Sequence, residues 1–262
     1  MKTFVTALIL VLAAISSFAG VTYKLDSKTT GLASANITGT VKVEGTGMRM
    51  ELASGDGVLF KNGSILTTKN GGKNILVTDP STKTYYELDL QHLGGAGPLL
   101  RQLGDSVKMT IENPKVTSRD AGDGGTIEGY ATRKKVIDSS YDMVIEAMGQ
   151  KMRMTTVTSS QLWVTDKLGA DLVNIFQIRG FKTGLDEIDR LIEKQSAAVT
   201  GFPLKQLTTV KVVQNGNEMT STTTINVSGL KETKLAPAEF ELPAGFTKTE
   251  SPIEKLLKQM PR

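Results

Sequence analysis

The sequence predicts a mainly β fold, a meandering antiparallel sheet or barrel of about a dozen strands with few helices. Period-two alternation rich in Thr, Val and Ile runs along most of the chain, which is typical of strands with one buried face. Tight-turn signals such as Asn215-Gly216-Asn217 close hairpins between these segments. Helical periodicity appears in only three places.

The predicted strands follow one another with turn signals between them. The alternation changes phase at Gly45-Thr46-Gly47, which predicts a turn or bulge. Asn62-Gly63 and Asn70-Gly71-Gly72 predict further turns, and Gly122–Gly125 predicts a turn rather than a linker. The predicted strands are Val21–Thr29, two strands around Ile37–Val43 and Met48–Leu52, Ser64–Lys69, Asn74–Thr78, Lys83–Leu88, Val107–Glu112, Lys115–Arg119, Thr126–Ile137, Ser140–Glu146, Lys151–Thr158, Gln161–Thr165, Leu204–Gln214 and Glu218–Val227.

The clearest helix is predicted over Leu185–Val199, where Leu185, Ile188 and Ile192 share one face. A short helix is predicted just before it, over Ala170–Ile178. Because these helices carry one apolar face each, we expect them to pack on the sheet.

A third helix is predicted at the C-terminus, over 252–260. Ser251 and Glu254 form a capping box, with Pro252 at the first helical position. One apolar stripe follows, which we expect to dock on the protein's own sheet or on a partner. Its residues are Ile253, Leu256, Leu257 and Met260.

The N-terminal segment Met1–Ala19 has the layout of a cleaved secretory signal. A positive start precedes an apolar run, and Ser17 and Ala19 are small residues ahead of Gly20. The run is shorter than the ~20 apolar residues that a bilayer span needs. Gly20 stands where a bacterial lipoprotein has Cys, so we expect a periplasmic protein released without a lipid anchor or a transmembrane anchor.

Composition narrows the function. The roughly 240 residues after the signal fit one β-rich domain, residues 20–262, and 39% apolar residues can form a core. The net charge is only +4, without a basic patch, which argues against nucleic-acid binding. The chain has no Cys, which excludes disulfides, thiol catalysis and cysteine metal sites. No cofactor motif is present, and we expect none.

The sequence Gly-x-x-Met-Arg-Met occurs twice, at Gly45–Met50 and Gly149–Met154. On a strand the two Met of each copy point to one face. Three interpretations stay open: ordinary core, a flexible hydrophobic cavity, or thioether ligands for Cu(I), which soft sulfur favours. The Met residues concerned are Met48, Met50, Met152 and Met154.

Candidates for catalysis are few. His92 is the only histidine, and no Ser elbow lies near it, so a triad or an imidazole zinc site is not predicted. Paired carboxylates could still serve a glycosidase, although the Asp and Glu residues at strand ends are ordinary turn residues. Trp163 and Tyr85 are packing residues or the edge of an apolar pocket.

The segment Gln91–Gly104 differs from the strands around it. A run of Gly with Pro98 precedes Leu99, Leu100 and Leu103. This pattern predicts a loop with a short packed helix, or a mobile lid over an apolar cavity.

The order of several short motifs resembles an uncharacterised exported bacterial family with a fold like that of the outer-membrane lipoprotein carrier proteins. The motifs are the two Met-Arg-Met sequences, Asp79-Pro80-Ser81, Lys83–Leu88, Gly125–Tyr130, Leu162–Thr165, Gly201-Phe202-Pro203 and Phe240–Phe246. The resemblance implies a strongly curved antiparallel sheet, an unclosed barrel, with helices on its concave face. It also implies a carrier of lipid acyl chains with no catalytic residues.

The sequence therefore predicts a periplasmic protein that binds a lipid or another hydrophobic molecule and is not an enzyme. The alternatives are an envelope interaction module without a cavity, with a protein partner, and more remotely a carboxylate hydrolase or a Cu(I)-handling protein. The predicted cavity residues are Met48, Met50, Tyr85, Met152, Met154, Trp163, Leu185, Ile188 and Ile192.

Overall fold

The structure is a computed structural model that describes residues 20–31, 34–55, 61–89, 107–147, 149–168, 183 and 185–259. The predicted signal Met1–Ala19, the predicted lid with Leu99, Leu100 and Leu103, His92, and the predicted helix Ala170–Ile178 lie outside the described residues.

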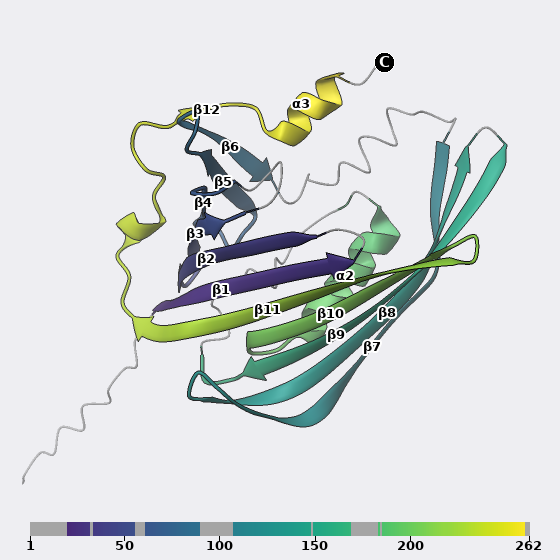
Figure 1. The fold of residues 1–262 in the computed structure, drawn as a ribbon, viewed down its shortest axis with the longest axis horizontal. Coiled ribbons are helices and arrows are strands. Elements are labelled where there is room, and N and C mark those ends of the chain that lie inside the picture. Colours follow the sequence, from purple (N-terminus) through teal and green to yellow (C-terminus); the bar gives the residue numbers. More distant parts are fainter. Residues whose placement is uncertain are drawn as a thin grey trace, which may run out of the picture.

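The described strands form one sheet of 12 strands in the order β12-β6-β5-β4-β3-β2-β1-β11-β10-β9-β8-β7 (Figure 1). The strands are β1 (Gly20–Gly31), β2 (Ala35–Glu44), β3 (Gly47–Ser54), β4 (Ile65–Thr68), β5 (Asn74–Asp79), β6 (Thr84–Asp89), β7 (Val107–Ile127), β8 (Tyr130–Ala147), β9 (Gln150–Thr165), β10 (Phe202–Gln214), β11 (Asn217–Thr233) and β12 (Thr247–Lys248). The helices are α2 (Asp186–Ala198), the 3-10 helix η2 (Pro237–Phe240) and α3 (Pro252–Gln259).

The sheet consists of two meanders joined through β1. Strands β2 to β6 follow one another on one side of β1, and β11 back to β7 follow on the other. Every pair is antiparallel except β12 with β6. The sheet is strongly curved and does not close, because β12 and β7 lie at its two ends. This confirms the predicted fold class.

Three long strands replace shorter ones that the sequence analysis predicted separately. The predicted strands Val107–Glu112 and Lys115–Arg119 are one strand, β7, with a bulge between Glu112 and Lys115. The turn predicted at Gly122–Gly125 is wrong, since these residues lie inside β7 at two further bulges. A bulge adds an unpaired residue and bends a strand without ending its pairing, so its Gly signal resembles that of a turn.

Strands β8 and β9 show the same difference. The predicted strand Thr126–Ile137 is wrong across Glu128-Gly129, which form the turn between β7 and β8 with positive φ at both residues. Beyond that turn, β8 continues through Ser139 and β9 continues through Ser159, although each of these residues lies between two separately predicted strands. Isolated Ser residues on a half-buried strand do not interrupt its ladder.

Other local predictions are confirmed. Turns occur at Gly45-Thr46, Asn62-Gly63 and Asn215-Gly216. Helix α2 differs from its prediction by one residue at each end. The capping box is present: Ser251 N–H donates to Glu254, and Glu254 N–H donates to the Ser251 hydroxyl at 3.1 Å.

Most of the core lies on one face of the sheet, which we call the inner face. Paired residues share a face, so the register places Tyr23, Val41 and Met50 on the same face as Ile137 and Leu162. The largest buried cluster covers this face of β1 to β6 and the first residues of β10. Within it, the rings of Tyr23 and Phe202 meet edge to face at 5.7 Å.

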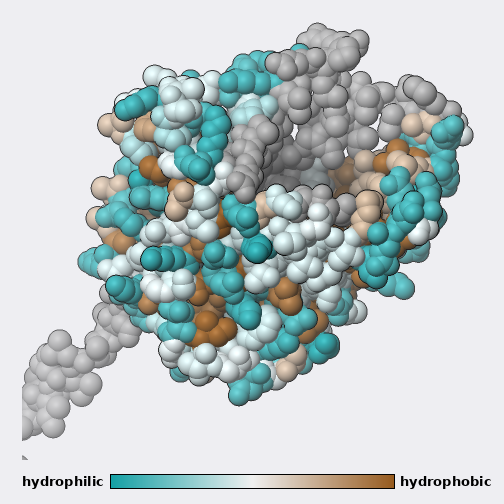
Figure 2. All heavy atoms as spheres, in the orientation of Figure 1, coloured by the Kyte–Doolittle hydropathy of each residue, from teal (hydrophilic) through white to brown (hydrophobic). Residues whose placement is uncertain are grey.

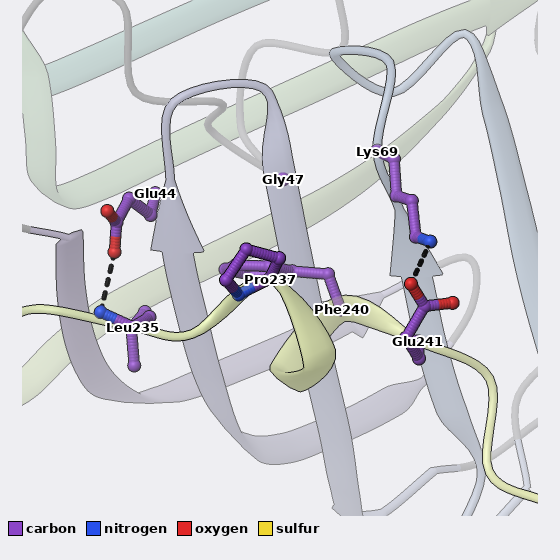
Figure 3. Close-up of a pocket in the computed structure, with 7 residues that line it drawn as sticks. All are labelled: Glu44, Gly47, Lys69, Leu235, Pro237, Phe240 and Glu241. Atoms are coloured by element: carbon purple, nitrogen blue, oxygen red, sulfur yellow. Dashed lines mark hydrogen bonds and ion pairs between the residues drawn. The ribbon is translucent and has the colours of Figure 1, made fainter.

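The segment after β11 crosses the opposite, outer face (Figure 3) and reaches the β6 edge at β12 (Figure 1). Phe240 in η2 is buried there, and its carbonyl accepts a hydrogen bond from Thr67 at 2.7 Å. Glu239 pairs with Lys42 at 2.7 Å. The segment continues into β12, which pairs with β6 and so covers that edge of the sheet.

Candidate functional site

The sheet curves around the side on which α2 lies (Figure 1). The end of α2 packs on the inner face, where Ala198 and Val199 contact the cluster of Ile137, Leu162 and Val164. Gln195 donates a hydrogen bond to Ser139 of β8. The helix is therefore fixed over the inner face of the long strands.

A cavity of about 310 Å³ separates α2 from β7. Its apolar walls are Pro114, Val116 and Leu191, and charged side chains line the rest. Pro114 lies in the β7 bulge between Glu112 and Lys115, so the bend of β7 shapes this cavity. The charged residues are Glu187, Arg190 and Lys194.

The predicted apolar face of α2 is not completely buried by its packing on the sheet. Leu185, Ile188 and Ile192 are each only partly buried, whereas Leu191 is 6% exposed. Ile188 is one turn from both Leu191 and Ile192, so these residues share one apolar face of α2, which the sheet covers only in part.

The inner face changes character along the long strands. A row of hydroxyls crosses it, with Thr29 bonded to Thr223 at 2.9 Å and Ser160 bonded to Thr208 at 3.0 Å. In the described part of the chain, two buried polar atoms lack a hydrogen-bond partner, the Tyr23 hydroxyl and Gln206 Oε1. Both lie on this face, and burial raises the pKa of Tyr23 well above its ordinary value.

Beyond the hydroxyl row, the inner face at the tip of the long strands is rich in methionine. The residues concerned are Met109, Met143, Met152, Met154 and Met219, interspersed with Ile111, Ile145 and Val212. Ile111 is 8% exposed, and the others are only partly buried. We call this set the methionine tip. It is an accessible apolar surface on flexible side chains.

The two Gly-x-x-Met-Arg-Met copies do not come together. Met48 and Met50 are 1% exposed within the core on β3. Met152 and Met154 lie on β9, and β2, β1, β11 and β10 stand between the two strands. The four thioethers therefore do not form the single group that a shared copper site would need.

Trp163 and Tyr85 lie apart from the inner face. Trp163 neighbours Leu162 and so points to the outer face, between the ammonium groups of Lys134 and Lys205, each 4.8 Å from the ring. Tyr85 alternates with the buried Tyr86 and lies in the β6 row that meets β12. These two aromatic residues are outer-face residues.

Sequence reasoning missed Met109, Met143 and Met219. A usable signal for Met143 was present, because the turn between Ala147 and Gln150 sets Met143 opposite Met154. Finding it requires that the segments 140–146 and 151–158 be paired as one hairpin.

Two shallow pockets flank η2 on the outer face, and Figure 3 shows the residues that line the first of them. Gly47, Pro237 and Phe240 line one of them, and Lys69 and Glu241 form an ion pair at its edge. Their volumes are about 310 and 280 Å³. The walls of both pockets are side chains that hold the crossing segment in place. We therefore interpret the pockets as gaps in the packing of that segment.

Among the described acidic residues, the clear pKa shifts all run in one direction. The four carboxylates whose pKa departs clearly from its ordinary value all have it lowered by ion pairs or hydrogen bonds; they are Asp79, Asp142, Glu239 and Glu250. Within the described ranges, no group of three His, Cys, Asp or Glu side chains is placed to hold a metal ion. A general acid needs a raised pKa, and none of these four has one.

A family model described as a domain of unknown function, DUF4412, matches residues 28–246. The chain belongs to this family. The resemblance to an uncharacterised family is thus confirmed. A comparison with curated proteins finds no match.

Several solved structures are similar to the chain, each at 10% identity. A structure of PNGF-II has a TM-score of 0.36 and matches 91% of this chain, which spans 33% of that protein. A LolA superfamily protein from Nitrosomonas europaea has a TM-score of 0.32, with 86% of this chain and 91% of that one covered. A DUF1329 family protein from Desulfovibrio piger has a TM-score of 0.31, with 88% and 92% covered. TM-scores this low carry no functional argument.

None of the helices in the described part of the chain is long and apolar enough to cross a bilayer. In the view of Figure 2, hydrophobic atoms appear as separate patches among hydrophilic ones. The partly exposed apolar side chains named above lie on α2 and on the methionine tip.

Proposed function

We propose that this protein is a soluble, non-catalytic periplasmic carrier that holds a lipid acyl chain or another hydrophobic molecule on the inner face of its sheet, beside α2. The observation that supports this most is the partly buried apolar face of α2, with Ile188 and Ile192, inside the curve of the sheet. Burial of apolar area is worth about 25 cal/mol per Å², so a hydrophobic ligand would gain by completing it.

Two further features support the proposal. The methionine tip extends the apolar inner surface, and methionine adapts to ligands of varied shape. The buried Tyr23 hydroxyl and Gln206 Oε1 have no partner among the described residues, and a buried polar group normally has one. A polar atom of a ligand would supply it.

The compartment rests on the signal-like segment ahead of Gly20. Strand β1 begins at Gly20, so cleavage after Ala19 would leave β1 complete. We expect protein recovered from a periplasmic fraction to have Gly20 as its first residue, as measured by the mass of its N-terminal peptide. Recovery of the uncleaved chain from the cytoplasm would contradict the proposed location.

Ligand binding is tested with the fluorescent fatty acid 11-(dansylamino)undecanoic acid. We expect the wild-type protein to bind this probe and the variant Ile188→Asn/Ile192→Asn to bind it at least tenfold more weakly, because the substitution makes the partly covered apolar face of α2 polar. The matched control is Val157→Asn. Val157 is 41% exposed and lies on β9, on the face opposite Met154 and Met152.

Circular dichroism and the urea midpoint establish that each variant is folded. The proposal fails if folded wild-type protein does not bind the probe, or if the α2 variant binds as tightly as the wild type. It also fails if Val157→Asn weakens binding as much as the α2 variant, since binding would then not depend on the inner face.

A further inference from the structure

We propose that the methionine tip contains a binding site for Cu(I), formed by the thioethers of Met143, Met152 and Met154. This inference does not rest on the proposed carrier function. It differs from the four-methionine grouping suggested by the sequence repeat, because Met143 of β8 replaces the distant pair on β3.

The register brings the three side chains together. Met143 and Met154 are directly paired across β8 and β9, which puts their Cβ atoms about 5 Å apart. Met152 is paired with Ile145 and lies two residues before Met154, so it is the diagonal neighbour of Met143 on the same face. Flexible thioether side chains can close the remaining distance to one ion.

The Gln214 amide shows where the Met152 sulfur points. Gln214 is paired with Met154 across β9 and β10, yet its Nε2 donates a hydrogen bond to Met152 Sδ at 2.8 Å. The sulfur of Met152 therefore lies on the inner face, within hydrogen-bond reach of the residue paired with Met154. Met143 is paired with Met154 as well, so the three thioethers occupy adjacent positions of the inner face.

The chemistry of the site favours a soft monovalent ion. Three thioethers without a carboxylate or imidazole select Cu(I) over Zn²⁺ or Mg²⁺. The charged groups nearby lie on the outer face, where Arg153 pairs with Glu112 and with Asp142 at 2.9 Å. All three Met are partly buried, so an ion can reach them from solvent.

The sequence contains its own control. Gly45–Met50 repeats the Gly-x-x-Met-Arg-Met pattern, but Met48 and Met50 are paired with Val43, Val41, Leu66 and Thr68, which offer no third sulfur. Met48 and Met50 are also 1% exposed. The same two thioethers at the same spacing should therefore bind no Cu(I).

The test is an anaerobic titration of Cu(I) against the chromophoric chelator bicinchoninate. We expect wild-type protein to withdraw one equivalent of Cu(I). The variant Met143→Leu/Met154→Leu should lose at least tenfold in affinity, while Met48→Leu/Met50→Leu should keep it. Leu conserves the volume and apolarity of Met, so each variant should fold, as circular dichroism and the urea midpoint establish.

The inference is overturned if the folded wild type withdraws no Cu(I), or if both double variants lose it equally. The carrier proposal is read separately, from the dansyl probe. Loss of Cu(I) binding in folded Met143→Leu/Met154→Leu, with Cu(I) binding kept in Met48→Leu/Met50→Leu, supports the thioether site, while the carrier proposal stands or fails on the probe binding of the wild type and the α2 variant.

Discussion

At the residue scale, contacts distant in sequence decide what several side chains do. Trp163 is an example. Alternation along β9 predicts that it points to the other face of the sheet from Leu162, but only the pairing with β8 and β10 places Lys134 and Lys205 beside its ring. Gly124 leaves room there, because a Cβ at that position would lie 2.9 Å from the Trp163 ring. A bulge glycine in β7 thus fits an aromatic side chain of β9.

Gly47 offers a test of such fitting. A Cβ at Gly47 would lie 3.0 Å from the Phe240 ring, which is tighter than van der Waals contact allows. We expect Gly47→Ala to lower the free energy of unfolding by about 1–3 kcal/mol, as overpacking does. Urea denaturation measures it. In the double variant Gly47→Ala/Phe240→Leu, the decrease in the free energy of unfolding should be smaller than the sum of the decreases in the two single variants. Strictly additive decreases would contradict a clash between the two side chains.

At the element scale, the sheet is held by turns and edges whose chemistry is local. The turn between β5 and β6 is an example: Asp79 accepts a hydrogen bond from Ser81 N–H at 3.0 Å and pairs with Lys61 at 2.6 Å. The first contact closes the turn, and the second ties it to the residues before β4. One carboxylate therefore joins two connections of the smaller meander.

This carboxylate gives a pH dependence. The hydrogen bonds from Lys61 and Ser81 lower the pKa of Asp79 from 3.8 to about 2. The folded pKa lies below the unfolded one, so the stabilisation is complete above about pH 4 and is lost as pH falls through about 2. We expect the stability difference between wild type and Asp79→Asn to shrink over this window in urea titrations. A constant difference from pH 5 to pH 2 would contradict it.

At the scale of the whole molecule, burial is uneven. The inner face of β1 to β3 is densely packed, with Val21, Val41 and Val43 fully buried. The side chains of the methionine tip are not buried to a comparable extent by the described residues. The structure thus combines a densely packed core with an accessible methionine tip.

Hydrogen exchange tests this difference. Opening costs less where fewer apolar groups are buried, so we expect amides of 141–147 and 150–156 to exchange faster than those of β1 to β3. Both sets of amides lie in paired antiparallel strands, so the two sets are matched in secondary structure. Equal protection would contradict it. Slower exchange at the tip on adding the fatty-acid probe would support the carrier proposal.

Sequence alone determined the features that depend on neighbouring residues. Alternation predicted the strands, Gly and Asn predicted the hairpin turns, and Ser251 with Glu254 predicted the start of α3. These signals are local because side-chain period and turn conformation are set within a few residues. Bulges were the exception, since the Gly residues of β7 carry the same signal as a turn.

Only the tertiary structure decided which faces and sites these elements form. The pairing of β1 with β11 joins Thr29 to Thr223, and the pairing of β8 with β9 joins Met143 to Met154 while Met50 stays in the core. Such pairings are chosen by the total apolar area that the folded sheet buries, because each strand could pair locally with several others. The sequence therefore specified a curved antiparallel sheet, and the folded chain selected which methionines remain accessible.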